Sequence, residues 1–324
     1  MEKKDLKIVF MGTPEFAVAS LRALVENGYR VVGVVTQPDK PVGRHQDRLQ
    51  PPPVKVYAQE HHIPVFQPEK MKDPAFIAQL RAMEADLQVV VAFRLLPEVV
   101  WDMPRFGTFN VHAALLPQYR GAAPINWAII NGETETGVTT FFLDKHVDTG
   151  RIIMQHRFPI PPDADMEYVY DGLMRLGADT ACETIELILK NDGSIPSTDQ
   201  EHIVNESKLV GKLKGAPKIF KDTCEINWNQ SAKQLHDFIR GLSPIPGAWT
   251  TVSIDGKPAT TLKIYKASPT TRKAADKPGL FIIEKGHIYA NATDFQLELL
   301  EVQLSGKKRM DARSFSNGVR SVER

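Results

Sequence analysis

The sequence predicts an α/β protein: a doubly wound, mainly parallel sheet in its first half, followed by a small β-barrel. Three observations support this prediction: wholly apolar strand segments alternate with helices, the composition changes near residue 207, and several short β-prone runs follow. Parallel strands are buried on both faces, so they lack the alternation of apolar and polar residues found in one-sided sheets. A chain of 324 residues is also too long for one compact core, which indicates two domains.

The first elements follow the Rossmann-like order of strand, turn and helix. Residues 6–11 are typical of a buried strand, and Gly12 gives a tight turn into a helix that Thr13 is expected to cap. Asn27 and Gly28 stop that helix. Neither a G-x-G-x-x-G nor a G-x-x-x-x-G-K-[ST] pattern occurs, so NAD and ATP are not expected as ligands.

Further strands are expected at residues 31–36, around Val65 and at 87–93, with a helix near 73–84. Ligands of such a sheet bind at the carboxyl ends of its strands. A long, proline-rich segment at residues 37–53 is basic at Lys40, Arg44 and Arg48. Long loops in compact domains are usually functional, so we favour a binding loop over an ordinary surface excursion.

The remaining part of the first domain contains two helices and a hairpin. A helix is expected at 123–131, and β-rich runs at 137–143 and 151–158 predict a hairpin at the sheet edge. A long helix fits 166–190. The predicted domains are therefore residues 1–190 and 207–324, joined by a linker at 191–206.

Beyond residue 207 the pattern predicts one helix and a small OB-like barrel. The helix is expected at 231–241, and the short strands at 248–254, 261–267, 280–284, 287–290 and 297–304. Residues 206–324 carry 20 basic against 12 acidic side chains, whereas residues 1–205 carry 20 against 27. This asymmetry favours a basic module that binds a polyanion such as nucleic acid; a solvated basic surface without a partner is the alternative.

Composition also predicts the compartment. The first five residues contain no apolar stretch typical of a signal peptide, and the most apolar region, 87–101, is interrupted by charged residues and proline. Cys182 and Cys224 lie far apart in sequence with no ligand cluster beside them, which indicates reduced thiols. We therefore expect a cytoplasmic protein without a membrane segment, a disulfide or a metal.

Asn110, His112 and Asp148 form the most informative pattern, because they are the parts needed to move an acyl group between two amines. Asn110 and His112 can donate hydrogen bonds to a carbonyl oxygen that gains negative charge. Asp148 can orient the imidazole and help to remove a proton. An isolated Asn-x-His would more often serve only as a pair of strand-end hydrogen-bonding groups, but the surrounding sequence favours catalysis.

That surrounding sequence resembles the methionyl-tRNA formyltransferases, a family of folate-dependent formyltransferases, over almost the whole chain. The motifs that carry the resemblance are Gly12–Phe16, Thr36–Asp39, Gly43-Arg44, Pro53–Lys55, Phe66–Pro68, Val89–Ala92, Asn110–His112, Leu115–Pro117, Arg120–Ile125, Glu135–Thr139, Asp148–Gly150, Gly215–Lys218 and Ile226–Trp228. Members transfer a formyl group from 10-formyltetrahydrofolate to methionine on initiator tRNA.

The resemblance implies a set of site residues. Asn110, His112 and Asp148 would be catalytic. The folate would contact Phe93, Arg94, Leu95, Ala114, Leu115, Leu116, Pro117 and Asp144. The tRNA would contact Lys40, Arg44, Arg48, Lys212, Lys214, Lys307 and Lys308. We expect a monomer that needs no metal.

Two positions depart from the family pattern. Ala114 stands where the family usually has serine before Leu-Leu-Pro, and Phe93-Arg94 stand where it tends to have tyrosine and glycine. The first change removes a hydroxyl beside the expected folate pocket, and the second adds a bulky cation near it. Both bear on folate contacts and leave the three catalytic residues intact.

The acceptor is less strongly indicated than the reaction. Other folate-dependent formyltransferases, acting on a sugar nucleotide or on a ribonucleotide, share the Asn, His, Leu-Leu-Pro and Asp set. The basic loop and the basic barrel are what favour tRNA. A small-molecule acceptor and a catalytically silent RNA-binding protein on the same scaffold are the two alternatives.

Overall fold

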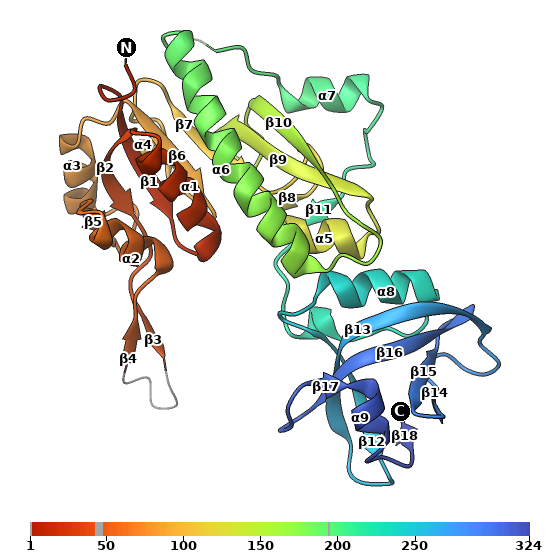
Figure 1. Cartoon of the computed structure of the whole chain (residues 1–324). Coiled ribbons are helices and arrows are strands. Elements are labelled where there is room, and N and C mark those ends of the chain that lie inside the picture. The colour runs from red at the N-terminus through yellow and green to blue at the C-terminus, as the bar shows by residue number, and fades with distance from the viewer. Residues whose placement is uncertain (1, 43–47, 194) are drawn as a thin grey trace. The chain divides into compact units, whose positions relative to one another are not determined.

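The computed structural model describes residues 2–42, 48–193 and 195–324 (Figure 1). The chain forms two compact units, the first made of Met1–Gly121, Thr136–Phe158 and Tyr170–Gly215 and the second of Ala122–Glu135, Pro159–Val169 and Ala216–Arg324. Two short segments from before residue 170 thus group with the second unit. The predicted domain boundaries at residues 190 and 207 stay a prediction.

The first unit is built on a seven-stranded sheet of order β10-β9-β7-β6-β1-β2-β5. Its strands are β1 (Lys7–Gly12), β2 (Arg30–Val35), β5 (Val65–Phe66), β6 (Leu87–Val91), β7 (Thr108–His112), β9 (Glu135–Phe142) and β10 (Ile152–Pro159). The five strands from β5 to β7 are parallel, and β9 pairs antiparallel with β7. The doubly wound, mainly parallel sheet is confirmed, as is the hairpin at its edge.

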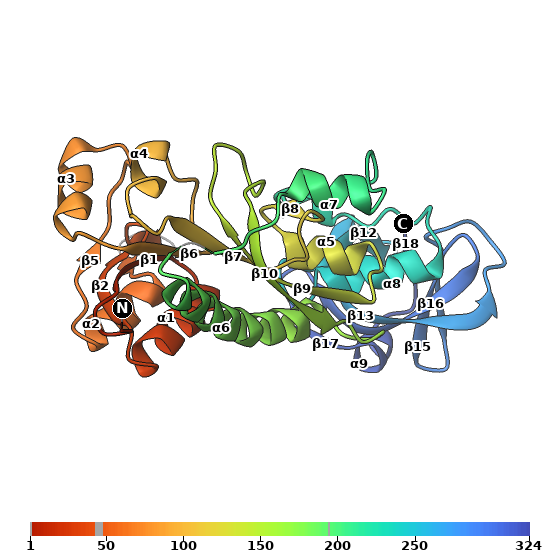
Figure 2. The same cartoon turned by 90° about the horizontal axis from the view of Figure 1, so that it is seen from above.

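Helices cover both faces of this sheet. In Figure 2, α1 (Glu15–Glu26), α2 (Pro53–Glu60) and α6 (Met166–Lys190) lie on one side, and α3 (Pro74–Ala82) and α4 (Glu98–Trp101) lie on the other. Strand residues that face α3 and α4, such as Val9, Met11 and Val90, form one buried cluster with side chains of those helices. The expectation that Thr13 caps the first helix is wrong, because Pro14 occupies the N-cap position and no side chain caps it.

The proline-rich segment contains regular structure that the sequence analysis missed. Strands β3 (Lys40–Val42) and β4 (Arg48–Gln50) pair antiparallel, and α2 follows directly. The predicted linker likewise contains α7 (Gln200–Glu206), whose N-cap Asp199 accepts a hydrogen bond from the amide of Glu201. Two short strands, β8 (Arg120–Gly121) and β11 (Gly215–Ala216), complete this part of the chain.

The second unit is an antiparallel, nearly closed barrel with helices packed against it. Its elements are α5 (Pro124–Ile130), the 3₁₀ helix Asp222–Cys224, α8 (Ala232–Gly241), β12 (Ala248–Ile254), β13 (Thr260–Lys273), β14 (Phe281–Glu284), β15 (His287–Asn291), β16 (Phe295–Leu304), β17 (Met310–Asp311), α9 (Ala312–Ser316) and β18 (Val322–Glu323). The strand order is β14-β15-β16-β13-β12-β18, and the end strands β14 and β18 also contact each other. The small barrel is confirmed.

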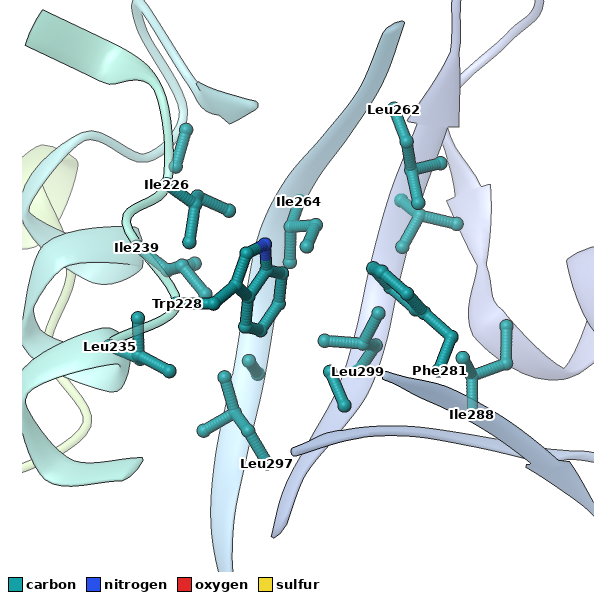
Figure 3. Close-up of a cluster of buried hydrophobic side chains, with 14 of the residues drawn as sticks. Ile226, Trp228, Leu235, Ile239, Leu262, Ile264, Phe281, Ile288, Leu297 and Leu299 are labelled. Atoms are coloured by element: carbon teal, nitrogen blue, oxygen red, sulfur yellow. The ribbon is translucent and has the colours of Figure 1, made fainter. Parts of the chain in front are cut away.

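The barrel core is centred on Trp228. Figure 3 shows its indole between Leu235 and Ile239 of α8 and the strand side chains opposite. The indole meets the ring of Phe281 edge-on at 5.4 Å between centroids, and its Nε1 donates to the hydroxyl of Thr250. Large apolar side chains from the helix and the sheet therefore hold this unit together.

Two further properties concern the described part of the chain. None of its helices has the length and the apolar composition needed to cross a bilayer. Cys182 and Cys224 are both free thiols, and burial raises the pKa of Cys182 to about 11. Cys182 is therefore a poor nucleophile at neutral pH.

Candidate active site

Strand β7 places Asn110 and His112 at the carboxyl end of the parallel sheet. Residues two apart on a strand point to the same face, so both side chains lie on one side of β7. In the register of the sheet, Asn110 is opposite Val90 on β6 and Phe141 on β9. Val90 belongs to the buried cluster beneath α3 and α4, so Asn110 and His112 lie on that face.

His112 is buried, and both of its ring nitrogens face oxygen atoms. Its Nε2 lies 2.9 Å from the carbonyl oxygen of Tyr119. A carbonyl can only accept, so Nε2 carries a proton and donates it. Nδ1 lies 3.9 Å from Oδ2 of Asp148, which is a charge contact when the ring is protonated and too long for a hydrogen bond.

Asp148 lies in a tight turn between β9 and β10. Its φ of 55° is in the left-handed region, which few non-glycine residues adopt. Its Oδ2 accepts a hydrogen bond of 2.9 Å from the amide of Gly121. Earlier in the turn, Asp144 accepts from the hydroxyl of Thr149 at 2.8 and 2.9 Å. The side chain of Asp144, predicted to contact folate, thus shapes the turn that presents Asp148.

The Leu-Leu-Pro segment runs directly after His112 and is fixed by two polar side chains. The hydroxyl of Thr139 donates to the carbonyl of Ala114 at 2.6 Å and accepts from the amide of Leu116 at 3.1 Å. Gln155 donates to the carbonyl of Leu116 at 2.8 Å. Ala114 is fully buried and Leu116 packs into a small core, so the folate contacts predicted for them stay a prediction.

Arg94 has a role that the sequence did not indicate. Its guanidinium donates to the carbonyl oxygens of Pro68 and Glu69, the latter at 2.9 Å, and burial lowers the pKa of Arg94. The side chain thereby ties the segment after β6 to the segment after β5. The next residue, Leu95, is 73% exposed, which is unusual for leucine.

An open cavity lies beside this exposed leucine. Its volume is about 1450 Å³, and it is lined by Lys70, Met71, Lys72, Ile77, Arg81, Leu95, Leu96, Pro97, Glu98, Val99, Asp102 and Met103. The lining combines apolar side chains with the cations Lys70, Lys72 and Arg81 and the carboxylates Glu98 and Asp102. Of the predicted folate residues, Leu95 lines this cavity directly.

The predicted tRNA residues fall into three places. Lys40 and Arg48 are exposed on the β3–β4 hairpin, and Arg44 lies outside the described residues. Lys212 and Lys214 are exposed in the first unit, before β11. Lys307 and Lys308 are exposed on the turn between β16 and β17 of the second unit.

Three side chains fix the base of the β3–β4 hairpin, and sequence reasoning gave them no role. Lys55 donates to both carboxylate oxygens of Asp39 at 2.8 and 2.7 Å, and Gln67 donates to Asp39 at 2.7 Å. Gln67 also donates to the carbonyl of Gln37 at 2.8 Å. The signal was present, since each of these residues lies in one of the motifs that carry the family resemblance.

Among residues 2–42, 48–193 and 195–324, no three or more His, Cys, Asp or Glu side chains are grouped so that they could hold a metal ion. The expectation that no metal is needed stays a prediction.

Comparison with known proteins gives one consistent family. Residues 6–185 match the model of the formyl transferase family, and residues 218–320 match that of the formyl transferase C-terminal domain. A methionyl-tRNA formyltransferase from Parabacteroides distasonis is 56% identical over 99% of this chain and 98% of its own length. Another from Bacteroides fragilis is 51% identical over 100% of this chain and 98% of its own length.

A solved structure supports the fold. An N-formyltransferase from Helicobacter canadensis, in complex with folinic acid and dTDP-3-aminofucose, aligns with a TM-score of 0.62 and 21% identity. The alignment covers 91% of this chain and 98% of that one. At this identity the likeness supports the fold alone.

Proposed function

Because the chain belongs to the formyl transferase family, we propose that it transfers the formyl group of 10-formyltetrahydrofolate to the amino group of methionyl initiator tRNA. The product is N-formylmethionyl-tRNA for translation initiation. The relatives of 51 to 56% identity along their whole length support the acceptor. The observation that carries the reaction is the placement of His112 beside Asp148, with Asn110 on the same face of β7.

The reaction forms one carbon–nitrogen bond and breaks another. The amine of methionine attacks the formyl carbon and loses a proton, the bond from that carbon to the folate nitrogen breaks, and the folate nitrogen takes up a proton as it leaves. Asn110 donates its amide hydrogens to the formyl oxygen as that oxygen gains negative charge. Loss of one such donor commonly lowers the rate about 100- to 1000-fold.

His112 and Asp148 supply the second hydrogen bond to the formyl oxygen and the removal of the amine proton. In this structure the Nε2–H group of His112 donates to the carbonyl oxygen of Tyr119. When the formyl oxygen takes the place of that carbonyl oxygen, the same group donates to the formyl oxygen. Asp148 faces Nδ1 and orients the ring. Its carboxylate also takes the amine proton through a water molecule.

The folate would be held beside the same strand ends. The cavity next to Leu95 offers apolar walls for the pterin and cations for the glutamate carboxylates, and the segment 114–117 borders His112. Together with Phe93, Arg94 and Asp144, these residues make up the proposed folate site. Folate supplies the formyl group and the leaving nitrogen.

The tRNA would be held by basic side chains from both units. Lys40, Arg44 and Arg48 on the hairpin segment, and Lys307 and Lys308 on the barrel, would bind phosphates, as would Lys212 and Lys214. Phosphate contacts give affinity without sequence choice. Free thiols and a substrate from translation support a cytoplasmic location, and we propose that the chain acts as a monomer.

The test is formyl transfer by the full chain from 10-formyltetrahydrofolate to methionyl initiator tRNA. His112→Ala is expected to lower the rate at least 100-fold, while His61→Ala, at an exposed histidine on the C-terminal end of α2, serves as the matched control. Free methionine and an amino sugar nucleotide are the alternative acceptors.

The outcomes separate the candidate functions. Transfer to charged tRNA alone, lost in His112→Ala, supports the proposal. Transfer to the sugar nucleotide alone keeps the chemistry and overturns the acceptor. Binding of tRNA without any formyl transfer overturns the enzymatic proposal and leaves a nucleic-acid-binding protein.

A further inference from the structure

Gln200 is a buried glutamine in the part of the chain that the sequence predicted to be a linker. It is the first residue of α7, and only 1% of its surface is exposed. A buried amide without hydrogen-bond partners would lower the stability of the fold. The segment before it is held in place by Thr198, whose amide and carbonyl both bond to Ile152 of β10 at 2.8 Å.

All the hydrogen-bonding capacity of the Gln200 side chain is used. Its Nε2 donates to the carbonyl oxygens of Asp148 at 3.0 Å and Gly150 at 2.8 Å. Its Oε1 accepts from Nε and Nη2 of Arg120 at 3.0 and 2.7 Å. Carbonyls only accept and a guanidinium only donates, so the orientation of the amide is determined by its partners.

These contacts join the two segments that hold the Asp148 carboxylate. Asp148 has a φ of 55°, and a Cβ on Gly150 would come within 1.7 Å of the carbonyl oxygen of Phe142. The backbone of this turn therefore needs support. The amide group of Gln200 bonds to the turn through its nitrogen and to Arg120 through its oxygen. Arg120 is the neighbour of Gly121, and the amide of Gly121 donates to Asp148.

We propose that Gln200 is a positioning residue for formyl transfer, which holds the Asp148 carboxylate at His112 by clamping the Asp148–Gly150 turn to Arg120. The inference rests on the proposed function and adds a residue from α7 to the site. Gln200 touches no reacting atom. Its two amide hydrogens fix where Asp148 lies, and its oxygen fixes the segment that supplies the amide bound to Asp148.

The first experiment compares Gln200→Met with the wild-type full chain. Methionine has nearly the same volume but no donor or acceptor that could replace the amide. We expect kcat for formyl transfer to fall about 10- to 100-fold, as for a displacement of roughly 1 Å at the reacting groups, with each KM within about threefold. Gln79→Met, at an exposed helical glutamine on α3, is the matched control and should leave kcat unchanged. A kcat of Gln200→Met within twofold of wild type would overturn the inference.

A double-mutant cycle separates positioning from general stability. In an Asp148→Asn background, Gln200→Met should lower kcat by less than about threefold, because the carboxylate that Gln200 positions is already gone. Equal losses in both backgrounds would assign Gln200 a purely structural role. Gln200→Glu is the second variant, since it keeps the acceptor for Arg120 but sets an oxygen against the two carbonyls. This variant should fold, and its kcat should be lower than that of the wild type. A kcat equal to that of the wild type would contradict the clamp.

Hydrogen exchange gives a readout that does not depend on turnover. The Gly121 amide, bonded to Asp148, should exchange at least about tenfold faster in Gln200→Met, whereas the Ile152 amide should change less. Unchanged exchange at Gly121 would overturn the inference even if the chain had no formyl transfer activity. Absence of transfer in the wild type, together with faster Gly121 exchange in Gln200→Met, would instead overturn the proposed function alone.

Discussion

At the residue scale, Asp148 combines a constrained backbone with an exacting chemical task. Its φ of 55° is tolerated by aspartate and asparagine better than by most residues, because their short side chains bond to nearby backbone. Its carboxylate is bonded to Gly121 and faces His112. Shape and charge can therefore be separated by substitution at this position.

Asp148→Asn keeps the shape and removes the charge. The amide oxygen can still accept from Gly121, and asparagine tolerates the left-handed backbone, so we expect the free energy of unfolding to change by less than about 1 kcal/mol. We expect kcat to fall about 100- to 1000-fold, because the carboxylate that orients His112 and takes the amine proton is gone. Thermal unfolding and steady-state transfer measure the two effects; a large loss of stability with unchanged kcat would contradict this division.

Asp39 is the second residue whose role can be tested alone. Hydrogen bonds from Gln67 and Lys55 hold the pKa of Asp39 below its ordinary value, so it is charged at neutral pH and anchors the hairpin base. In Asp39→Ala we expect weaker tRNA binding, by about three- to tenfold, because the hairpin must be ordered during binding. The rate at saturating tRNA should be unchanged. Filter binding and kcat are the measurements, with exposed Asp5→Ala as control; a fall in kcat alone would contradict a binding role.

At the element scale, helix α8 begins where the sequence predicts and also buries an ion pair. Ser231 and Gln234 form a capping box at its start, which agrees with the start that the sequence predicts at residue 231. The helix also buries Asp237 and Arg240, which pair at 2.8 Å. Lys233 also pairs with Asp237, and Arg240 also donates to the carbonyl of Ala164 at 2.7 Å. Removing Asp237 would leave the buried guanidinium of Arg240 without its carboxylate, which is costly.

His236 on α8 gives the second unit a dependence on pH. Burial, followed by the charge of Arg240, lowers the pKa of His236 below its ordinary value near 6.5, although Asp237 and Asp163 act against this. The unfolded chain therefore binds a proton at a higher pH than the folded unit does. Stability from this group is complete above about pH 6.5 and is lost as the pH falls toward the folded pKa.

The corresponding prediction concerns urea unfolding followed by the fluorescence of Trp228 and its neighbours. The free energy of unfolding should fall between pH 7.5 and 5, with a slope from His236 of at most about 1.4 kcal/mol per pH unit. In His236→Gln this part of the slope should disappear, whereas exposed His202→Gln should keep it. Parallel curves for wild type and His236→Gln would contradict the assignment.

Other elements show how far sequence patterns reach. The helix expected at 166–190 matches α6 in both bounds, because a long amphipathic run is a local signal. Helix α2 begins at Pro53, the third of three consecutive prolines, because proline suits the first turn of a helix. The strand expected to end at residue 267 runs on to Lys273, and the register of β13 shifts beyond Pro269, which is where proline is tolerated.

The residues of the candidate site also differ in how far the sequence predicts them. Asn110 and His112 could be placed on one strand face because their spacing alone determines it. The clamp by Gln200 and the hairpin anchor by Asp39 depend on residues that are 16 to 80 positions apart in sequence. Such long-range polar contacts leave no periodic signal, and only the folded chain brings their members together.

At the scale of the whole molecule, charge separates the two halves of the chain. Residues 1–205 carry more acidic than basic side chains, and residues 206–324 carry 20 basic against 12 acidic ones. Within the first unit the exposed cations Lys40 and Arg48 stand on the hairpin, away from the sheet that carries the site. Steering of a polyanion by such a distribution is strong at low salt and screened at high salt.

The salt dependence of tRNA binding can therefore report how many cations each unit contributes. Every neutralised phosphate releases a counterion, so the logarithm of the binding constant falls linearly with the logarithm of the salt concentration. Replacing Lys307 and Lys308 together by alanine should make this slope shallower by about 1 to 2, as should replacing Lys40 and Arg48.

In both double variants kcat at saturating tRNA should stay at the wild-type value, because we assign the four side chains to phosphate binding and not to the reaction. A Lys4→Ala, Lys190→Ala double variant removes two exposed cations from elsewhere in the first unit and should leave the slope unchanged. If the slope shifts equally in all three, net charge alone attracts the tRNA. If the slope becomes shallower only in the variant that lacks Lys40 and Arg48, the basic surface of the barrel lies outside the tRNA interface.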